Sequence, residues 1–190
     1  QVGRINTPLK REGKATHPRQ AHLSTWGVLC PNETPEGSGC GLVKNLTVLA
    51  HVRVGTSNQL LTSALVTFLG VHPVTDVHLD MLTTCPLVCV NGAIVGVCSG
   101  GVDPGTLVRD ARRARRRKLL PYDTSIIRKP YGVLLTSDAG CVMRPVLVLD
   151  QLHNVSTAMR DEDSMPTEEL WTWLRNVGVI EYLDKEEESQ

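Results

Sequence analysis

The chain has 190 residues, of which 41% are hydrophobic, and its 20 basic and 20 acidic residues leave no formal net charge. This length and composition provide enough apolar material for one or two compact units with a buried core. No run approaches the ~20 apolar residues of a membrane span, and no charged-then-apolar leader opens the sequence, so we expect a soluble protein without membrane contact.

The charges are unevenly distributed along the chain. Residues 1–30 hold five basic residues against one acidic residue, whereas residues 160–190 hold ten acidic residues against three basic ones. This asymmetry predicts that the N-terminal end faces a polyanion and that the C-terminal end faces solvent or a basic partner.

Residues 1–20 combine prolines, a glycine and spaced basic side chains, without apolar periodicity. This pattern predicts an extended or mobile basic loop. The cations Lys10, Arg11 and Lys14 fit contacts to nucleic-acid phosphates, and they fit a solvated loop equally well.

The next segment is a loop rich in proline and glycine. Residues 30–37 contain two prolines, two carboxylates and a glycine, and Gly39 and Gly41 follow directly. Such a run forms neither a helix nor a central strand. Because apolar segments flank it, the loop is suited to present backbone and carboxylates at a fixed place. A connecting loop whose glycines serve geometry alone is the alternative interpretation.

Two regular elements are predicted in the middle of the chain. Apolar periodicity indicates a helix near 58–69, with Ser57 or Asn58 as its N-cap and Gly70 at its end. Asn91 and Gly92 stand between two apolar runs, which is the strongest local signal for a β-hairpin because both turn positions need positive φ.

A basic helix is predicted over residues 104–119, since Asp103-Pro104 is a typical helix start. Seven of the ten residues from 109 to 118 are basic, which alone would favour nucleic-acid binding. A charge run on a helix is more often a solvated face, and no aromatic residue is interleaved for base stacking. We therefore favour a solvated or subunit-facing surface, with DNA or RNA contact as the alternative.

The last third is predicted to be rich in strands. Strands are expected at 125–128, 133–136 and 142–149, and the turn at 137–140 predicts a hairpin of the last two. Residues 151–166 fit a loop or insertion. A helix starting at Thr167, a strand at 179–184 and an acidic tail at 185–188 complete an α+β fold of short β-hairpins with a few covering helices.

Six cysteines occur, without any CxxC pair, so the spacing does not favour a zinc site. Disulfides need a secreted context that nothing in the sequence supports. Buried free thiols are the preferred interpretation, and no metal ligand is assigned.

Four linked motifs within roughly thirty residues carry a family resemblance of much higher specificity than any single pattern. They are KATHPRQ at 14–20, WGVLCP at 26–31, ETPEG at 33–37 and CGLVKNL at 40–46. Together they resemble the fork region of the second-largest subunit of multisubunit DNA-directed RNA polymerases of the eukaryotic, archaeal and large-DNA-virus branch. Similar spelling at 136–145 and 181–188 extends the resemblance over essentially the whole chain.

The resemblance implies a fragment of a larger multidomain subunit, with a fork region at 1–57, an external lobe at 58–130 and a following β-rich domain at 131–190. It implies that Glu36 lies near the nucleotide-addition site and that Arg19 and Gln20 help to place the downstream template. Lys10, Arg11, Lys14 and Arg19 would contact phosphates. Ser38 and Cys141 depart from the family pattern, which usually has glutamine and arginine there, so roles of those side chains are not transferred.

The sequence contains no aspartate cluster of the kind that holds the catalytic metals of phosphoryl transfer. The resemblance therefore implies that no catalytic residue lies in this chain and that Mg²⁺ is bound elsewhere in the enzyme. Expected partners are the largest subunit and other polymerase subunits, the DNA template, the RNA–DNA hybrid and nucleoside triphosphates. A nuclear polymerase II type is the first expectation, and an archaeal or viral cytoplasmic enzyme is the alternative. The rival hypothesis is a stand-alone nucleic-acid-binding or subunit-interaction module that uses the helix at 104–119.

Overall fold

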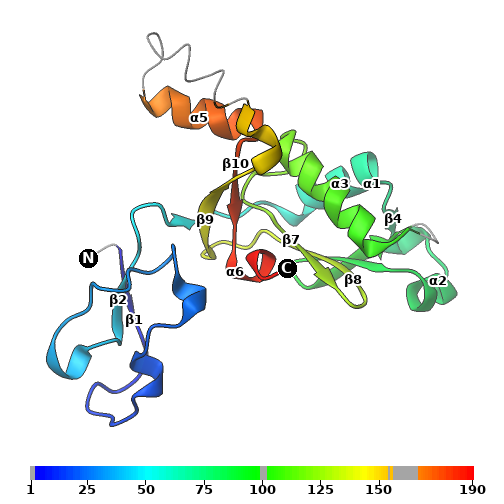
Figure 1. The fold of residues 1–190 in the computed structure, drawn as a ribbon. Helices are drawn as coiled ribbons and strands as arrows, with labels where there is room; N and C mark the ends of the chain where they lie inside the picture. Colours follow the sequence, from blue (N-terminus) through cyan, green and yellow to red (C-terminus); the bar gives the residue numbers. More distant parts are fainter. Residues whose placement is uncertain (1–2, 99–101, 154, 156–166) are drawn as a thin grey trace.

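The structure is a computed structural model that describes residues 3–98, 102–153, 155 and 167–190. A small N-terminal unit, residues 3–50, lies to one side of a larger body (Figure 1). Short helices and small sheets alternate along the chain, so the predicted α+β class is confirmed. No described helix combines the length and the apolar character needed to cross a membrane.

The N-terminal unit is built around one short antiparallel pair, β1 (Arg4–Asn6) with β2 (Val43–Asn45). Three 3-10 turns cover His17–Arg19, Leu23–Thr25 and Gly37–Gly39. Its buried apolar side chains are few: Val28, Leu42 and Val43. Most of the basic loop predicted at 1–20 is irregular and exposed.

The body contains a five-stranded sheet with the order β4-β6-β5-β8-β7. The strands are β4 (His72–Pro73), β5 (Leu87–Val90), β6 (Ala93–Val97), β7 (Ser125–Lys129) and β8 (Gly132–Thr136). Neighbouring strands are antiparallel except β5 and β8, which are parallel.

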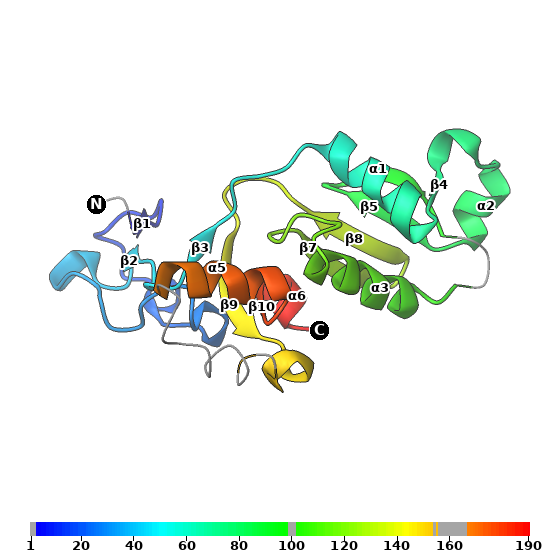
Figure 2. The same ribbon diagram turned by 90° about the horizontal axis from the view of Figure 1, so that it is seen from above.

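Two helices, α1 (Asn58–Leu69) and α3 (Pro104–Arg116), lie side by side on one face of this sheet (Figure 2). The core forms where Leu61 and Leu65 of α1 and Leu107 and Ala111 of α3 meet the apolar side chains of β5, β7 and β8. The short helix α2 (Leu79–Thr84) precedes β5.

A three-stranded sheet, with the order β10-β9-β3, lies between the N-terminal unit and the five-stranded sheet (Figures 1 and 2). Its strands are β3 (His51–Val52), β9 (Val142–Leu147) and β10 (Ile180–Leu183). The helix α5 (Thr167–Val177) precedes β10, and the short helix α6 (Lys185–Glu188) follows it.

Two local predictions are confirmed closely. The helix predicted near 58–69 is α1, and Gly70 ends it at φ 62°, although Ser57 at its N-cap makes no side-chain capping bond. Asn91 and Gly92 connect β5 to β6 with φ values of 49° and 83°, the signs that a type I′ turn requires.

The hairpin predicted around 137–140 is wrong. β8 pairs with β5 and β7, whereas β9 belongs to the other sheet and pairs with β3 and β10. The apolar runs flanking the turn are buried in different sheets, and local sequence does not distinguish a hairpin from such a crossing. The real hairpin joins β7 to β8 and spans the proposed domain boundary at 130/131; the three-part division remains a prediction.

The predicted basic helix is three residues shorter than expected. α3 ends at Arg116, and Lys118 adopts a left-handed conformation with φ 63° that terminates it. Most of the loop or insertion predicted at 151–166 lies outside the described residues.

Candidate nucleic-acid interface

The proline- and glycine-rich loop is held in shape by side chains that bond to its backbone. The Thr34 hydroxyl donates to the carbonyl of Val43 at 3.2 Å and accepts from the Gly41 N–H at 2.7 Å. The Asn45 side chain donates to the carbonyl of Glu33 at 3.2 Å. These bonds fasten the loop to β2 at Glu33 and Thr34 and join Gly41 to Thr34, so the interpretation of a shaped loop fits the structure.

Arg19 connects this loop to the basic segment before it. Its guanidinium donates to the carbonyls of Ser38 and Cys40 at 2.7 and 2.9 Å. It also donates to the carbonyls of Arg11 and Gly13 at 2.7 and 3.2 Å. Four of the five N–H donors of an arginine are thereby used within the chain. This geometry supports a loop-holding role, whereas phosphate contact by Arg19 remains a prediction.

Gly41 is the point of closest approach between the two segments. It has φ 72°, and a Cβ added there would lie 2.3 Å from the carbonyl oxygen of Arg19. Only glycine combines this conformation with this distance. By contrast, Gly37, at φ 75°, would have no atom within 4 Å of an added Cβ.

The remaining predicted site residues are exposed around this junction. Glu36 precedes the turn Gly37–Gly39, and its carboxylate has no donor partner among the described residues. The side chains of Gln20, Lys10, Arg11 and Lys14 are exposed as well. The structure thus brings Arg19 and the carbonyl of Arg11 together with the loop, and it leaves the other side chains accessible to a partner.

A small cavity of about 90 Å³ lies between residues 19–21 and the loop. Thr34 and Lys44 line it together with Arg19 and Gln20. Sequence reasoning did not single out Thr34 or Lys44. Both residues lie within the sequence motifs, which was the available signal. The sequence does not show that their side chains point into this cavity.

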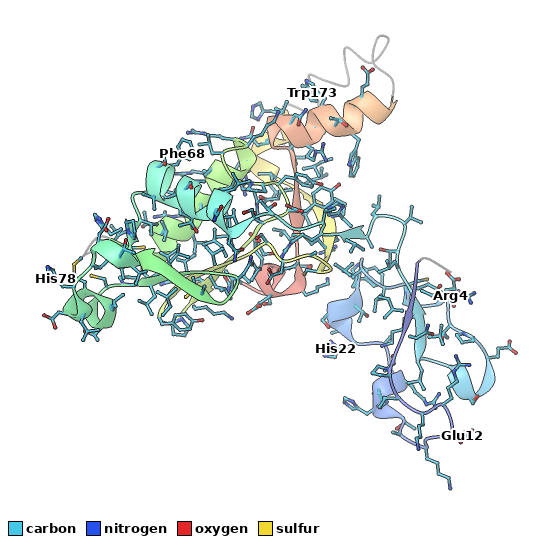
Figure 3. The ribbon with its side chains drawn as sticks, turned by 180° about the vertical axis from the view of Figure 1, so that it is seen from behind. Arg4, Glu12, His22, Phe68, His78 and Trp173 are labelled. Carbon is cyan, nitrogen blue, oxygen red and sulfur yellow. The ribbon has the colours of Figure 1, made fainter. Side chains whose placement is uncertain are left out.

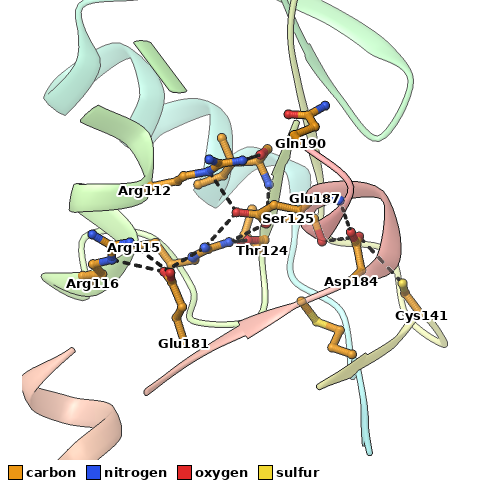
Figure 4. A network of polar contacts seen from close by, with 12 residues as sticks. Arg112, Arg115, Arg116, Thr124, Ser125, Cys141, Glu181, Asp184, Glu187 and Gln190 are labelled. Atoms are coloured by element: carbon orange, nitrogen blue, oxygen red, sulfur yellow. Dashed lines mark hydrogen bonds and ion pairs between the residues drawn. The ribbon is translucent and has the colours of Figure 1, made fainter. Parts of the chain in front are cut away.

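The basic helix does not present a uniform cationic face, because three of its arginines bond to the C-terminal segment (Figure 4). Arg115 is 3% exposed and holds both carboxylate oxygens of Glu187, at 2.8 and 2.9 Å. Arg116 pairs with Glu181 at 2.9 Å, and Arg112 with Glu187 at 3.1 Å. The chain supplies its own basic partner for these C-terminal carboxylates.

These contacts shift the pKa of two groups. Burial alone would lower the pKa of Arg115, but Glu187 and Glu181 more than offset this effect and raise it. Burial would raise the pKa of Glu181, but the bonds and charges of Arg116 and Arg115 hold it below its ordinary value. Glu187 is 3% exposed and also accepts from the N–H of Ile126. The acidic tail at 185–188 was expected to face solvent or a basic partner, and at Glu187 it faces the basic partners Arg115 and Arg112 of the chain itself.

A second buried pair lies where the chain leaves the N-terminal unit. Arg53, 2% exposed, pairs with Asp184 at 3.5 Å, and the hydroxyl of Ser125 bonds to both. The Arg53 N–H donates to the carbonyl of Cys141 at 2.9 Å. These contacts connect the end of β3 with β7 and with the start of α6.

The cysteines are free thiols. Burial raises the pKa of Cys98 to about 11, and Cys89 is buried as well, as expected. Cys40 is exposed, which contradicts the expectation for that residue. Over the described ranges, no three His, Cys, Asp or Glu side chains gather into a set that could hold a metal ion.

The N-terminal unit and part of the body each match a known protein family. The family model "RNA polymerase Rpb2, domain 3" matches residues 1–52, and "RNA polymerase Rpb2, domain 4" matches residues 88–150. The chain is 39% identical to the DNA-directed RNA polymerase II subunit RPB2 of Encephalitozoon cuniculi, over 97% of this chain and 16% of that protein. It is 35% identical to the same subunit of Schizosaccharomyces pombe, with the same two coverages.

A viral relative is also similar. The chain is 33% identical to the probable RPB2 homolog of Invertebrate iridescent virus 6, over 82% of this chain and 13% of that protein. The chain thus spans about a sixth or less of the length of these relatives. Since two consecutive domain models and near-complete alignments agree with the polymerase motifs, the chain belongs to the RPB2 family, the second-largest subunits of DNA-directed RNA polymerases.

Proposed function

We propose that this chain is the part of a polymerase second-largest subunit that positions downstream DNA, the RNA–DNA hybrid and the incoming nucleotide during template-directed RNA synthesis. The observation that carries the proposal is the junction of the basic segment with the loop at 30–41. Arg19 and Gly41 join the two segments, while Glu36 and the cations Lys10 and Lys14 stay exposed beside them. Fixed placement of such groups lowers a catalytic barrier without any bond-making residue.

The complete enzyme would contain the largest subunit, further subunits, DNA, RNA and nucleoside triphosphates. The carboxylates in the described part of this chain do not gather into a metal-binding set, so we assign Mg²⁺ to residues of the complete enzyme outside it. The relatives named as polymerase II subunits of eukaryotes support a nuclear location. The viral relative keeps a cytoplasmic enzyme as the alternative.

Replacing Glu36 tests the positioning role. In the assembled enzyme, Glu36→Ala changes the rate or the fidelity of nucleotide addition while subunit assembly stays intact, because the exposed carboxylate bonds to nothing within the described chain. Glu12→Ala, at another exposed carboxylate of the same unit, is the matched control and leaves both quantities unchanged. Normal addition kinetics for Glu36→Ala would contradict the proposal.

The salt dependence of DNA binding distinguishes the two roles considered for Arg19, loop holding and phosphate contact. If Arg19 holds the loop, Arg19→Ala and Arg19→Lys both slow nucleotide addition, since an ammonium cannot reproduce the guanidinium fork. The salt slope of DNA binding then stays unchanged. If Arg19 contacts a phosphate, Arg19→Ala lowers that slope by about one and Arg19→Lys restores it. Lys14→Ala, at an exposed cation, is expected to lower the slope and serves as the reference.

The rival function, a stand-alone nucleic-acid-binding module, depends on the basic helix. Arg112, Arg115 and Arg116 are engaged with carboxylates of the chain itself, which removes them from a DNA-binding face. We therefore prefer the polymerase role. Tight and cooperative DNA binding by these 190 residues alone would favour the rival.

A further inference from the structure

Two cavities beside α1 and α3 have no part in the junction described above. The first, about 440 Å³, lies between α1, the segment after α3 and the end of α5, and the second, about 480 Å³, lies between the end of α1 and α3. Leu119 lines both cavities. The two cavities thus meet at Leu119, and we name them together the α1/α3 groove; Figure 2 shows the two helices side by side.

The groove exposes large apolar side chains that the core does not use. Leu60 is 67% exposed, Phe68 is 53% exposed and Leu119 is 40% exposed. Phe68 is the only phenylalanine of the chain, and Figure 3 labels it on α1. Exposed apolar residues along α1 and in the segment after α3 are typical of a surface that another protein segment covers.

The charged side chains that line the groove are almost all cationic. Arg113, Arg117, Lys118 and Arg175 belong to this set. Asp110 is the one carboxylate among the described lining residues, and it pairs with Arg113 at 3.3 Å. The guanidinium of Arg175 lies over the ring of Tyr122 at 4.6 Å, which orients it beside the first cavity. The groove thus has an excess of positive charge beside its apolar floor.

The cations of α3 divide into two groups with different surroundings. Arg115 and Arg116 turn toward Glu181 and are used inside the chain. Arg117 and Lys118 are exposed, and no carboxylate in the described part of the chain pairs with them. The left-handed backbone at Lys118 ends the helix and turns the chain so that Leu119 enters the groove next to these charges.

We propose that the α1/α3 groove binds an acidic segment of a partner protein that carries apolar anchor side chains. The anchors fill the two cavities beside Leu119, and the carboxylates of the segment face Arg117, Lys118 and Arg175. This is the helix-in-groove mode of recognition combined with charge complementarity. A nucleic-acid strand fits less well, because Arg175 covers the ring of Tyr122 and leaves Phe68 as the one other aromatic ring among the described lining residues, too few for successive bases to stack.

We expect the partner segment to belong to another protein of the polymerase assembly, so the inference rests on the proposed function. A photoreactive phenylalanine analogue replaces Phe68 in the assembled enzyme, and the cross-linked segment is identified by mass spectrometry. We expect a segment in which Asp and Glu outnumber Lys and Arg. The double variant Arg117→Glu with Lys118→Glu is expected to reduce the cross-link about tenfold, since it reverses two facing charges. Arg109→Glu, on α3 but outside both cavities, is the control and leaves it unchanged.

The outcomes separate the two proposals. Cross-links to DNA or RNA, cross-links to a basic segment, or none from an assembled and active enzyme would overturn the groove inference alone. A subunit that does not assemble into a polymerase would contradict the proposed function. In that case the groove is tested on the chain itself with a labelled peptide that has Leu at positions i, i+3, i+4 and i+7 and Glu at the positions between them. The peptide must bind the Leu119→Asp variant about tenfold more weakly than the unchanged chain, and the Arg109→Glu variant equally well. Equal binding to the unchanged chain and to both variants would overturn the inference.

Discussion

The N-terminal unit and the body are held together by different interactions. In the body, α1 and α3 bury a continuous apolar cluster against the sheet, and a buried ion network attaches the C-terminal segment. The N-terminal unit buries only Val28, Leu42 and Val43 as apolar side chains and depends on bonds from Arg19, Thr34 and Asn45 to backbone carbonyls. The predicted site residues all lie in the unit with little core, so their geometry depends on a few specific hydrogen bonds.

The largest effect is expected in the body, at Glu187. Glu187→Ala leaves the buried guanidinium of Arg115 without its bidentate partner, and it removes the acceptor of the Ile126 N–H. Breaking a buried pair from one side costs about 3–5 kcal/mol of the free energy of unfolding. Urea unfolding of the chain measures this loss. Glu186→Ala, at an exposed neighbour, is the control, and a loss no greater than that of the control would show that the network does not stabilise the body.

The N-terminal unit is tested by a matched pair of glycines. Gly41→Ala places a Cβ 2.3 Å from the Arg19 carbonyl oxygen at a positive φ, whereas Gly37→Ala has the positive φ without any close atom. We expect Gly37→Ala to cost about 1 kcal/mol of backbone strain and Gly41→Ala clearly more. Hydrogen exchange of the amides in residues 34–43 measures the local opening free energy.

Equal protection in the two glycine variants would contradict the close approach of Arg19 to Gly41. In the assembled enzyme, Gly41→Ala is expected to impair nucleotide addition together with the loop, while Gly37→Ala retains more activity. This result would connect the geometry of the junction to function independently of any charged side chain.

The sequence predicted those elements whose signals are local. α1 and the β5–β6 turn were predicted correctly because apolar spacing, a terminal glycine and an Asn-Gly pair act within a few residues. The β8–β9 hairpin failed because strand pairing across sheets depends on distant partners. Within the site, the motif letters identified the loop and Arg19. They did not show that the Arg19 donors turn inward, since that depends on the folded positions of four carbonyl groups.

The two charge clusters teach the same lesson. The basic run of α3 and the acidic C-terminal run were both evident from the sequence, but their pairing joins residues more than sixty positions apart. A charge run predicts a solvated face when no partner is known. Complementary runs of opposite sign in one chain were the available signal for an internal network.

A smaller effect is expected when the pH is lowered, because the ion pairs of Glu181 in the body contribute less to stability in acid. The pKa of Glu181 is held below its ordinary value of 4.5 in the folded chain. Its contribution to stability is therefore complete above about pH 4.5 and is lost as the pH falls through the lower, folded-state pKa. Glu181→Gln is expected to reduce the acid dependence of the unfolding midpoint below pH 4.5. Glu12→Gln, at an exposed carboxylate of the N-terminal unit, is the control, and identical acid dependence in both variants would contradict this assignment.

The smallest effect is expected at Arg113, an arginine of α3 that is exposed to solvent, unlike the buried Arg115. Within the described part of the chain, Arg113 pairs with Asp110 alone, at 3.3 Å, and both side chains are about half exposed or more. Solvent screens such a pair, so Arg113→Ala should change the free energy of unfolding by no more than about 0.5 kcal/mol. Arg115→Ala, two residues further on, removes the partner of Glu187 and Glu181 and should cost several times as much. Similar losses in urea unfolding for both variants would mean that the internal network contributes no more than a surface pair. The stability of the body would then come from the apolar core alone.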